Sequence, residues 1–401
     1  MEINQYNRFK SMFENLKVLE LASVLAGPGV GQFFAELGAT VIKVENPKTA
    51  GDVTRSWKVS GERTDDRSAY FCAVNWGKKS IAIGLDTDEG REIVYQLVQK
   101  SDIVIASYKP GDAAKIGVDY DTLRKLNPKL IYGQITGYGS NDNRVGYDAV
   151  IQAEAGFMFM NGEPGGASLK MPVALIDILA GHHLKEGILL AMLEQARTGK
   201  GDFVEVSLIQ AAIASLANQA TNWLVAGKIP QKKGSAHPNI APYGDVFTTA
   251  AGHEVLLAIG SDRQFRDVCD LLEVQEIAHD PKFSTNPSRV NNRVLLHHVL
   301  QERIARYETG SIIKALNEAK IPAGIIRNIA QVFETEQAKE LLFHSDDRVG
   351  VKTYVGSPNP KKSSHFLPPP HFGEHTVEIL SDFLKMSPKA IQKLIFEGSV
   401  R

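Results

Sequence analysis

The sequence predicts an α/β protein with two domains. Its 401 residues exceed what a single hydrophobic core usually holds. Apolar residues make up 43% and charged residues 23% of the chain, which is the ordinary balance of a globular protein. In the first half, short β-branched runs alternate with stretches whose apolar residues recur at helical spacing. This alternation is typical of a parallel sheet with helices on both faces.

The alternating elements can be placed along the first half of the chain. Strands are expected at 18–22, 40–45, 80–83, 103–106, 130–135 and 203–207, and helices at 32–37, 89–100, 120–126 and 184–197. The last of these helices ends before Gly199, and glycine favours helix termination. A long Ala-rich helix is expected over 208–226.

The segment from Gly227 to Pro242 is rich in Lys, Gly and Pro, and it predicts a linker. A second αβ segment follows over 243–327 and opens with an expected hairpin of 245–249 and 254–259. The tail contains a Pro-rich turn at 367–371 and two further helical stretches. The chain is therefore expected to divide into 1–226, the linker 227–242, 243–330 and 331–401.

Composition argues against several classes of partner. The net charge of −1 gives no reason to expect nucleic acid or a membrane surface. No run approaches the roughly 18 apolar residues of a membrane span, and Met1 to Tyr6 lacks the apolar core of a signal peptide. Cys72 and Cys269 belong to no CxxC or Cys/His cluster, so neither a disulfide framework nor a zinc site is expected. A cytoplasmic location is the default for such a chain.

No metal site is expected among the histidines. The chain has 11 of them, and none shows HExxH spacing. His182 and His183 are adjacent, but neighbouring residues on a helix point about 100° apart and do not readily share one ion.

A Gly-rich loop is expected at Ala26-Gly-Pro-Gly-Val-Gly31, directly after the first strand. Its spacing is GxGxG rather than the GxGxxG of a dinucleotide fingerprint, and Pro28 lies inside it. A nicotinamide-dependent oxidoreductase is therefore only a minor alternative, and a simple βα turn is another. The segment does favour close approach of the backbone to an anion at a helix N-terminus.

Asp177 is the candidate catalytic residue. It is the one charge in the run Pro172-Val-Ala-Leu-Ile-Asp-Ile-Leu-Ala-Gly181. Burial of a carboxylate is costly, and Asp is rarely fully buried without a partner. Asp is also favoured as a cap or turn residue where a helix begins, and this segment alone leaves both interpretations open.

Several segments, in order along the chain, carry a resemblance to a known family. They are Leu25-Ala-Gly-Pro28, Leu37-Gly-Ala-Thr-Val-Ile-Lys-Val-Glu-Asn-Pro47, Gly51-Asp-Val-Thr-Arg55, 75–80, Tyr108-Lys-Pro-Gly111, Leu126-Asn-Pro128, Gly146-Tyr-Asp148, the Asp177 run, Arg197-Thr-Gly-Lys-Gly201, Val206-Ser-Leu208, 237–244, Ile321-Pro-Ala-Gly324 and Gly373-Glu-His-Thr376. Together they resemble the family III CoA-transferases, a superfamily that includes formyl-CoA and carnitine CoA-transferases and α-methylacyl-CoA racemases. The resemblance covers nearly the whole chain.

The resemblance implies a fold and an assembly. It implies a Rossmann-like large domain built from 1–226 and the returning segment 331–401, with a smaller α+β domain at 243–330 between them. Two ring-shaped subunits would interlock into a homodimer. The Gly-rich segment would then contact coenzyme A (CoA) rather than a nicotinamide, with CoA as a substrate and no permanently bound cofactor.

The resemblance also implies covalent chemistry at Asp177. The matching Asp of the family attacks the thioester of an acyl-CoA, and aspartyl anhydride and aspartyl-CoA thioester intermediates follow. Exchange of one carboxylate for another makes each half-reaction nearly isoenergetic, and covalent catalysis divides a difficult transfer into easier steps. The anhydride is sensitive to water, so an apolar setting suits it.

Nine residues of this chain match positions that line the CoA path in the family. They are Leu25, Ala26, Asn46, Ile83, Ser107, Tyr108, Lys115, Ile116 and Tyr147. Lys115 is the cation expected near the phosphates, unless it is a solvated helix residue. Tyr108 is expected either to stack on adenine or to pack in the core. Some members of the family have Lys where this chain has Asp86, and Arg where it has Asn46.

A transferase is favoured over a racemase of the same superfamily. The racemases pair the Asp with a His in a Gly-His-Asp triplet, but this chain has Gly146-Tyr147-Asp148. Tyr, whose ordinary pKa is about 10, is a poor base for proton transfer at an α-carbon. A protein that binds CoA without chemistry is another alternative, and the Asp in its apolar run argues against it.

Contacts to the acceptor acid are expected from His237, Asn239 and Tyr243, although these residues also fit an ordered loop. The formyl-CoA transferases have a Gly-rich flap where this chain has Ile259-Gly-Ser-Asp-Arg-Gln264. The single glycine there argues against oxalate as the substrate, and the sequence leaves the acid open.

Overall fold

The computed structural model describes residues 12–345, 348–356 and 366–401. Contacts divide the chain into two compact units, and each is described by itself. The first unit holds the described residues up to Ala155, Met171–Ala220 and those from Glu340 onward, and the second holds Gly156–Lys170 and Thr221–Lys339. The contact boundaries therefore differ from the sequence-based division, because 156–170, 221–226 and 331–339 belong to the second unit.

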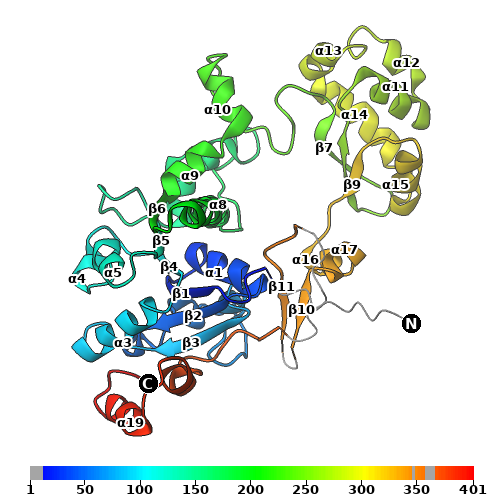
Figure 1. Ribbon diagram of the computed structural model, residues 1–401. Helices are drawn as coiled ribbons and strands as arrows, with labels where there is room; N and C mark the ends of the chain where they lie inside the picture. Colours follow the sequence, from blue (N-terminus) through cyan, green and yellow to red (C-terminus); the bar gives the residue numbers. More distant parts are fainter. Residues whose placement is uncertain (1–11, 346–347, 357–365) are drawn as a thin grey trace, which may run out of the picture. The chain divides into compact units, whose positions relative to one another are not determined.

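A six-stranded sheet forms the centre of the first unit (Figure 1). Its strands are β1 (Lys17–Leu21), β2 (Thr40–Glu45), β3 (Lys78–Ala82), β4 (Ile103–Ala106), β5 (Ile131–Thr136) and β6 (Asp202–Ser207). All neighbouring pairs are parallel, and the strand order is β3-β2-β1-β4-β5-β6. This is the order of a doubly wound sheet, in which ligands bind outside the carboxyl ends of the strands where the order reverses. That reversal lies between β1 and β4.

Helices cover both faces of this sheet. The helices of the first unit before its tail are α1 (Ala26–Glu36), η1 (Pro47–Thr49), η2 (Val53–Ser56), α2 (Ala69–Cys72), α3 (Asp88–Val98), α4 (Asp112–Lys115), α5 (Tyr120–Leu126), α6 (Asp148–Glu154), α8 (Leu175–Thr198) and α9 (Leu208–Ala214). One face packs Leu19, Ile81 and Val104 against α3, α5 and the C-terminal tail. The other face carries α1 and α8, which contact each other.

The tail returns to the same sheet. It holds the hairpin β10 (Leu342–His344) and β11 (Val349–Val351), then α18 (Thr376–Glu378), the π-helical turn η3 (Ile379–Phe383) and α19 (Pro388–Phe396). Leu380 and Leu394 join the core beneath α3, and Val400 pairs with Ile83 just beyond β3. The predicted tail helices are therefore present.

The second unit is built on an antiparallel sheet of β7 (Tyr243–Thr248), β8 (Glu254–Ala258) and β9 (Ala323–Ile325). The expected hairpin is β7–β8. Its helices are α7 (Phe157–Met160), α11 (Asp262–Leu271), α12 (Gln275–His279), α13 (Asn286–Asn291), α14 (Arg293–Ile304), α15 (Thr309–Glu318), α16 (Ile329–Phe333) and α17 (Glu336–Lys339). Phe247, Phe265 and Leu300 lie in its separate hydrophobic core.

Two sequence-based expectations are wrong in detail. The Gly-rich segment 26–31 is not a loop, because it forms the first turns of α1. Pro28 is tolerated there, since the first turn of a helix leaves its amides without partners. A Cβ on Gly27 would lie 2.4 Å from the Cβ of Ala22, so the glycine serves close packing of α1 on β1 rather than a turn.

The expected long helix over 208–226 is also wrong, because it breaks into α9 and α10 (Ala217–Leu224). The Ser215 hydroxyl donates to the carbonyl of Ala211 at 2.8 Å, and Ala217 has a φ of 47°. A serine that bonds to the preceding turn competes with the helical ladder. No helix among the described residues is long and apolar enough to cross a membrane.

Candidate active site

Asp177 lies in the first turn of α8, which begins earlier than the sequence analysis placed it. Ala174 occupies the N-cap and offers no side-chain acceptor, so the cap comes from another helix. The Asp148 carboxylate, at the start of α6, accepts a hydrogen bond from the Ile176 amide at 2.7 Å. The other carboxylate oxygen of Asp148 accepts from the Gln152 side chain at 2.7 Å. Asp148 therefore fixes the turn of α8 that carries Asp177.

The Asp177 carboxylate is buried and has no hydrogen-bond or ion-pair partner among the described residues. Its residue is only 9% exposed. Burial, followed by the negative charge of Asp148, raises the pKa of Asp177 to about 7. Strongly shifted carboxyl groups without a structural partner are typical of reactive sites. The helix-cap interpretation does not account for this side chain, because no backbone amide bonds to it.

The N-terminus of α1 packs against the same part of α8. Gly181 lies one helical turn after Asp177, on the same side of α8. A Cβ on Gly181 would lie 3.2 Å from the carbonyl oxygen of Ala26, so this glycine allows the two helices to approach. The N-cap of α1 is Leu25, which offers no side-chain acceptor to the first amides. The first turns of the two helices therefore lie together.

The Tyr70 phenol senses the charge of Asp177 and was not singled out from the sequence. Burial raises the pKa of its phenol, and the charges of Asp177, Asp148 and Asp52 raise it further. Its ring packs edge-on against Trp57, with 5.2 Å between the ring centroids. Tyr70 lies in the short helix α2, more than a hundred residues before Asp177. No local pattern could have linked the two.

Most residues predicted to line the CoA path follow the carboxyl ends of the parallel strands. Leu25 and Ala26 come after β1, Asn46 after β2, Ile83 after β3, and Ser107 and Tyr108 after β4. The Ser107 hydroxyl accepts from the Ser23 amide at 3.2 Å, across the point where the strand order reverses. Lys115 ends α4, Ile116 follows it, and Tyr147 precedes α6. The fold thus gathers residues far apart in sequence along one edge of the sheet.

The residues predicted to line the CoA path differ in how far their side chains are exposed to solvent. The Ile83 side chain is fully buried, and Tyr108 and Ile116 pack against the same core. Burial raises the pKa of Tyr108 to about 12. Lys115 is exposed and forms an ion pair with Asp112 at 2.8 Å, whereas Tyr147 is 58% exposed beside Asp148. Asp86 pairs with Lys48 on the surface.

The three residues expected to contact the acceptor acid lie together within the second unit. The His237 amide donates to the Tyr243 carbonyl at 2.8 Å, and their rings meet at 5.2 Å between centroids. The Asn239 amide donates to Nδ1 of His237 at 3.1 Å. The end of the linker that carries His237 and Asn239 is therefore held against the start of β7 by hydrogen bonds.

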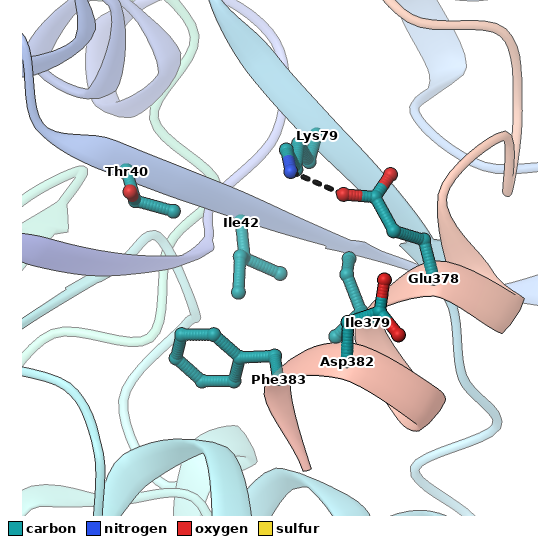
Figure 2. A pocket seen from close by; sticks show the side chains of 7 residues that line it. All are labelled: Thr40, Ile42, Lys79, Glu378, Ile379, Asp382 and Phe383. Atoms are coloured by element: carbon teal, nitrogen blue, oxygen red, sulfur yellow. Dashed lines mark hydrogen bonds and ion pairs between the residues drawn. The ribbon is translucent and has the colours of Figure 1, made fainter. Parts of the chain in front are cut away.

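Other features of the described residues do not coincide with Asp177. A hollow of about 160 Å³ is lined by Thr40, Ile42, Lys79, Glu378, Ile379, Asp382 and Phe383, with Lys79 and Glu378 paired across it (Figure 2). It lies at the amino ends of β2 and β3, away from the carboxyl edge. His183 faces Glu186 on α8, and His182 is exposed.

One group of side chains has spacing suitable for a metal ion: Asp65, Asp66 and His371. The Asp66 carboxylate already pairs with Arg55 at 3.2 Å and with His371, and Asp65 pairs with Arg67 at 2.6 Å. These ion pairs account for the cluster without a metal.

Comparison with known proteins identifies the family of the chain. Residues 13–376 match the model described as CoA-transferase family III. The chain is 38% identical over 390 residues to the succinate–glutarate CoA-transferase of Agrobacterium fabrum, covering 93% of this chain and 96% of that protein. It is 34% identical over 396 residues to the succinyl-CoA:glutarate CoA-transferase of Homo sapiens, covering 96% and 89%.

A solved structure gives the same result for the fold. The CAIB/BAIF family protein from Brucella suis superposes with a TM-score of 0.80 at 39% identity, covering 92% of this chain and 98% of that one. The family match spans most of the chain, and the relatives match nearly end to end. The resemblance inferred from the sequence motifs is thus confirmed: the chain belongs to CoA-transferase family III and is a CoA-transferase.

Proposed function

We propose that Asp177 is the nucleophile that carries the acyl group and then CoA during transfer between an acyl-CoA and a carboxylic acid. The observation that supports this most strongly is the carboxylate itself, which is buried, unpartnered among the described residues and has a pKa of about 7. Such a group is largely deprotonated above neutral pH and poorly solvated. Both properties favour nucleophilic attack.

The reaction balances in four steps. An Asp177 oxygen attacks the thioester carbon, the C–S bond breaks, and an acyl–aspartyl anhydride and CoA thiolate result. The thiolate attacks the aspartyl carbonyl and releases the donor acid, which leaves an aspartyl-CoA thioester. The acceptor carboxylate attacks that thioester to give a second anhydride and thiolate. The thiolate then attacks the acceptor-derived carbonyl, which forms the new acyl-CoA and frees Asp177.

The surroundings of Asp177 fit these intermediates. An anhydride hydrolyses in water, and a buried carboxylate protects it. Each attack places negative charge on a carbonyl oxygen, and the uncapped first turn of α1 offers backbone amides close to α8. Such amides stabilise developing charge without having to reorganise.

The CoA molecule is proposed to follow the carboxyl edge of the sheet. The residues proposed to line it are Leu25, Ala26, Asn46, Ile83, Ser107, Tyr108, Lys115, Ile116 and Tyr147. Because the Ile83 side chain is fully buried, the contact of Ile83 with CoA would be made by its main-chain atoms. Binding energy from the nucleotide end can then position the thioester at the distant carboxylate. CoA is a substrate here, and no permanently bound cofactor is proposed.

The acid is proposed to be a small dicarboxylic acid. The two relatives named above are called transferases for succinate or succinyl-CoA and glutarate, and these acids carry two carboxyl groups. His237, Asn239 and Tyr243 remain the proposed acceptor contacts. In support, the His237 and Tyr243 rings contact each other, and the Asn239 main chain bonds to the His237 ring.

A transfer screen tests the proposal. Purified protein is mixed with succinyl-CoA or acetyl-CoA and a panel of mono- and dicarboxylic acids, and new thioesters are identified by mass spectrometry. Hydroxylamine added during turnover should label Asp177. A racemase would instead exchange the α-proton of a 2-methylacyl-CoA into deuterated water, and a nicotinamide enzyme would bind NAD. Exchange without transfer, or NAD binding without CoA binding, would overturn the proposal.

The pH dependence of the rate is a second expected outcome. Because the ionised carboxylate reacts, kcat/KM for the acyl-CoA should rise about tenfold per pH unit below pH 7 and level off above it. Asp148 raises the pKa of Asp177, so Asp148→Asn should shift this rise to lower pH while its amide oxygen still accepts from Ile176. Asp121→Asn, at an exposed helix start, should leave the profile unchanged. A profile that stays in place in Asp148→Asn would contradict this electrostatic coupling.

A homodimer in the cytoplasm completes the proposal, with interlocked Rossmann-like subunits as the family resemblance implies. In support, α8 and α9 pack together and expose large apolar side chains, with Leu190 66%, Leu193 70% and Ile213 54% exposed. Exposed apolar surface of this kind usually marks an interface.

The dimer predicts a mass about twice the 43.9 kDa of the chain in sedimentation. Leu193→Glu should produce monomers, because it would place a charge in the interface. Val294→Glu, at a residue 86% exposed in the second unit, is the matched control and should leave the mass unchanged. A wild-type protein that sediments as a monomer would exclude the dimer.

A further inference from the structure

The connection between β1 and α1 contains a strained residue. Val24 has a φ of 73°, in the left-handed region that favours glycine. A β-branched side chain is a genuine outlier there, because its Cβ crowds the backbone. Such strain persists only where the surrounding structure determines the conformation, and it concentrates at functional sites.

Three buried charged side chains hold this connection. The Asp52 carboxylate accepts a hydrogen bond from the Val24 amide, at 3.2 and 3.4 Å to its two oxygens. The Lys43 ammonium donates to the carbonyl of Ala22 at 2.9 Å. The Lys78 ammonium donates to the carbonyl of Pro28 at 2.9 Å. The main chain is thus fixed before, at and after the strained residue.

These side chains form one ion network beneath α1. Glu20 pairs with Lys43 at 3.0 Å and with Lys78 at 2.8 Å, and Lys43 pairs with Asp52 at 2.9 Å. All four side chains are at most 1% exposed. The positive charges of Lys43 and Lys78 balance the negative charges of Glu20 and Asp52. Burial alone would lower the pKa of Lys43, but the neighbouring carboxylates raise it, so it stays charged.

A network of this kind is a poor source of stability. Removing four charged groups from water costs about as much as their attraction returns, and apolar replacements of similar size are often as stable. What the network does provide is control over the position of the main chain, because each ion pair includes a side chain that bonds to a specific main-chain atom between residues 22 and 28. That observation favours a role in geometry.

The connection that is held lies directly before the proposed site. Val24 follows the carboxyl end of β1, and two residues later α1 begins beside Gly181 of α8. A shift of the 24–26 main chain would move the first amides of α1 relative to Asp177.

We propose that Asp52 is a positioning residue for CoA transfer: by holding the Val24 amide in the strained conformation, it fixes the first turn of α1 opposite Asp177. The inference rests on the proposed role of Asp177. It assigns to Asp52, within the motif Gly51-Asp-Val-Thr-Arg55, a role that neither the nucleophile nor CoA contacts explain.

Asp52→Ala and Val24→Gly, alone and combined, test the proposal by steady-state kinetics. In Asp52→Ala the Val24 amide loses its acceptor, so Val24 should relax to negative φ, and kcat should fall about 10²-fold while KM for the acyl-CoA stays within about threefold. Val24→Gly should keep kcat within about twofold, because glycine adopts φ of 73° without strain. The double variant should regain at least about tenfold over Asp52→Ala, since glycine no longer needs the carboxylate to hold it.

Thr54→Val is the matched control. It removes the 2.8 Å bond from the Thr54 hydroxyl to Asp52 but leaves the Val24 bond, so kcat should stay unchanged. If Asp52→Ala yields no folded protein, Asp52→Glu takes its place, because it keeps the charge next to Lys43 but displaces the carboxylate. The same loss and the same rescue by Val24→Gly are expected.

A folded Asp52 variant with wild-type kcat, or a loss that Val24→Gly does not rescue, would overturn the positioning role. Neither result would affect the nucleophile proposal, which fails instead if hydroxylamine does not label Asp177 in the wild-type protein. The two ideas are therefore distinguishable in the same set of proteins.

Discussion

Replacement of Asp177 by Asn or Ala should abolish CoA transfer while CoA binding is largely kept. Removal of a covalent nucleophile typically costs at least about 10⁴-fold in kcat, because no other group takes over bond formation. The amide of Asn has nearly the shape of the carboxylate but cannot form the anhydride. Affinity for CoA should change little, since most of its proposed contacts lie along the carboxyl edge of the sheet. Transfer is measured by mass spectrometry of the thioesters, and binding by calorimetry with CoA.

The control for this variant is Asp88→Asn. Asp88 also lies in the first turn of an α-helix, but its side chain is 91% exposed and pairs with Arg91. Its replacement should leave kcat within about twofold, as is usual for an exposed position. Turnover by Asp177→Ala that approaches the wild-type rate would show that the nucleophile lies elsewhere.

The same substitution to Asn should stabilise the protein at neutral pH. The ordinary pKa of Asp is 3.8, and burial raises that of Asp177 to about 7 in the folded state. Both states are protonated below the ordinary pKa. As the pH rises from about 4 to 7, the unfolded chain releases the proton first, and folding stability falls. At about 1.4 kcal/mol per pKa unit, the loss amounts to about 4 kcal/mol above pH 7.

Asn does not titrate, so Asp177→Asn escapes this loss. The difference in unfolding free energy between variant and wild type should grow from pH 4 to pH 7 by about 4 kcal/mol and then stay constant. Any cost of burying the amide itself is the same at every pH, which makes the slope the informative quantity. Thermal or urea midpoints at pH 4, 5.5, 7 and 8 provide it. A difference that does not change with pH would contradict the raised pKa.

The sequence predicted the parts of the fold that depend on local patterns. The Thr40–Glu45 and Ile103–Ala106 strands match the observed β2 and β4, because buried parallel strands are continuous β-branched or apolar runs. It failed where packing overrides a local preference. Gly27 and Pro28 are typical of loops, yet they open α1 since the helix must lie close to β1.

The candidate site was predicted only in part. Asp177 stood out because a single carboxylate interrupts an apolar run. Glu20, Lys43 and Lys78 did not, because polar residues in a strand are ordinarily assigned to a solvent-exposed face. Tyr70 did not either, because it lies in α2, far from Asp177 in the sequence. Only the three-dimensional structure shows that these charges lie beneath α1 and compensate one another.

Gly31 links helix packing to this buried charge and has an evolutionary consequence. A methyl group on it would lie 1.9 Å from a carboxylate oxygen of Glu20 and 3.3 Å from the Lys78 side chain. A larger residue at 31 alone would clash with the Glu20 carboxylate, and replacement of Glu20 alone would leave the lysine charges unbalanced. Homologous chains with a bulkier amino acid at 31 should therefore have changed position 20 as well. They should also have changed Lys43 and Lys78, the lysines that neutralise Glu20. These sites should therefore co-vary across the lineage.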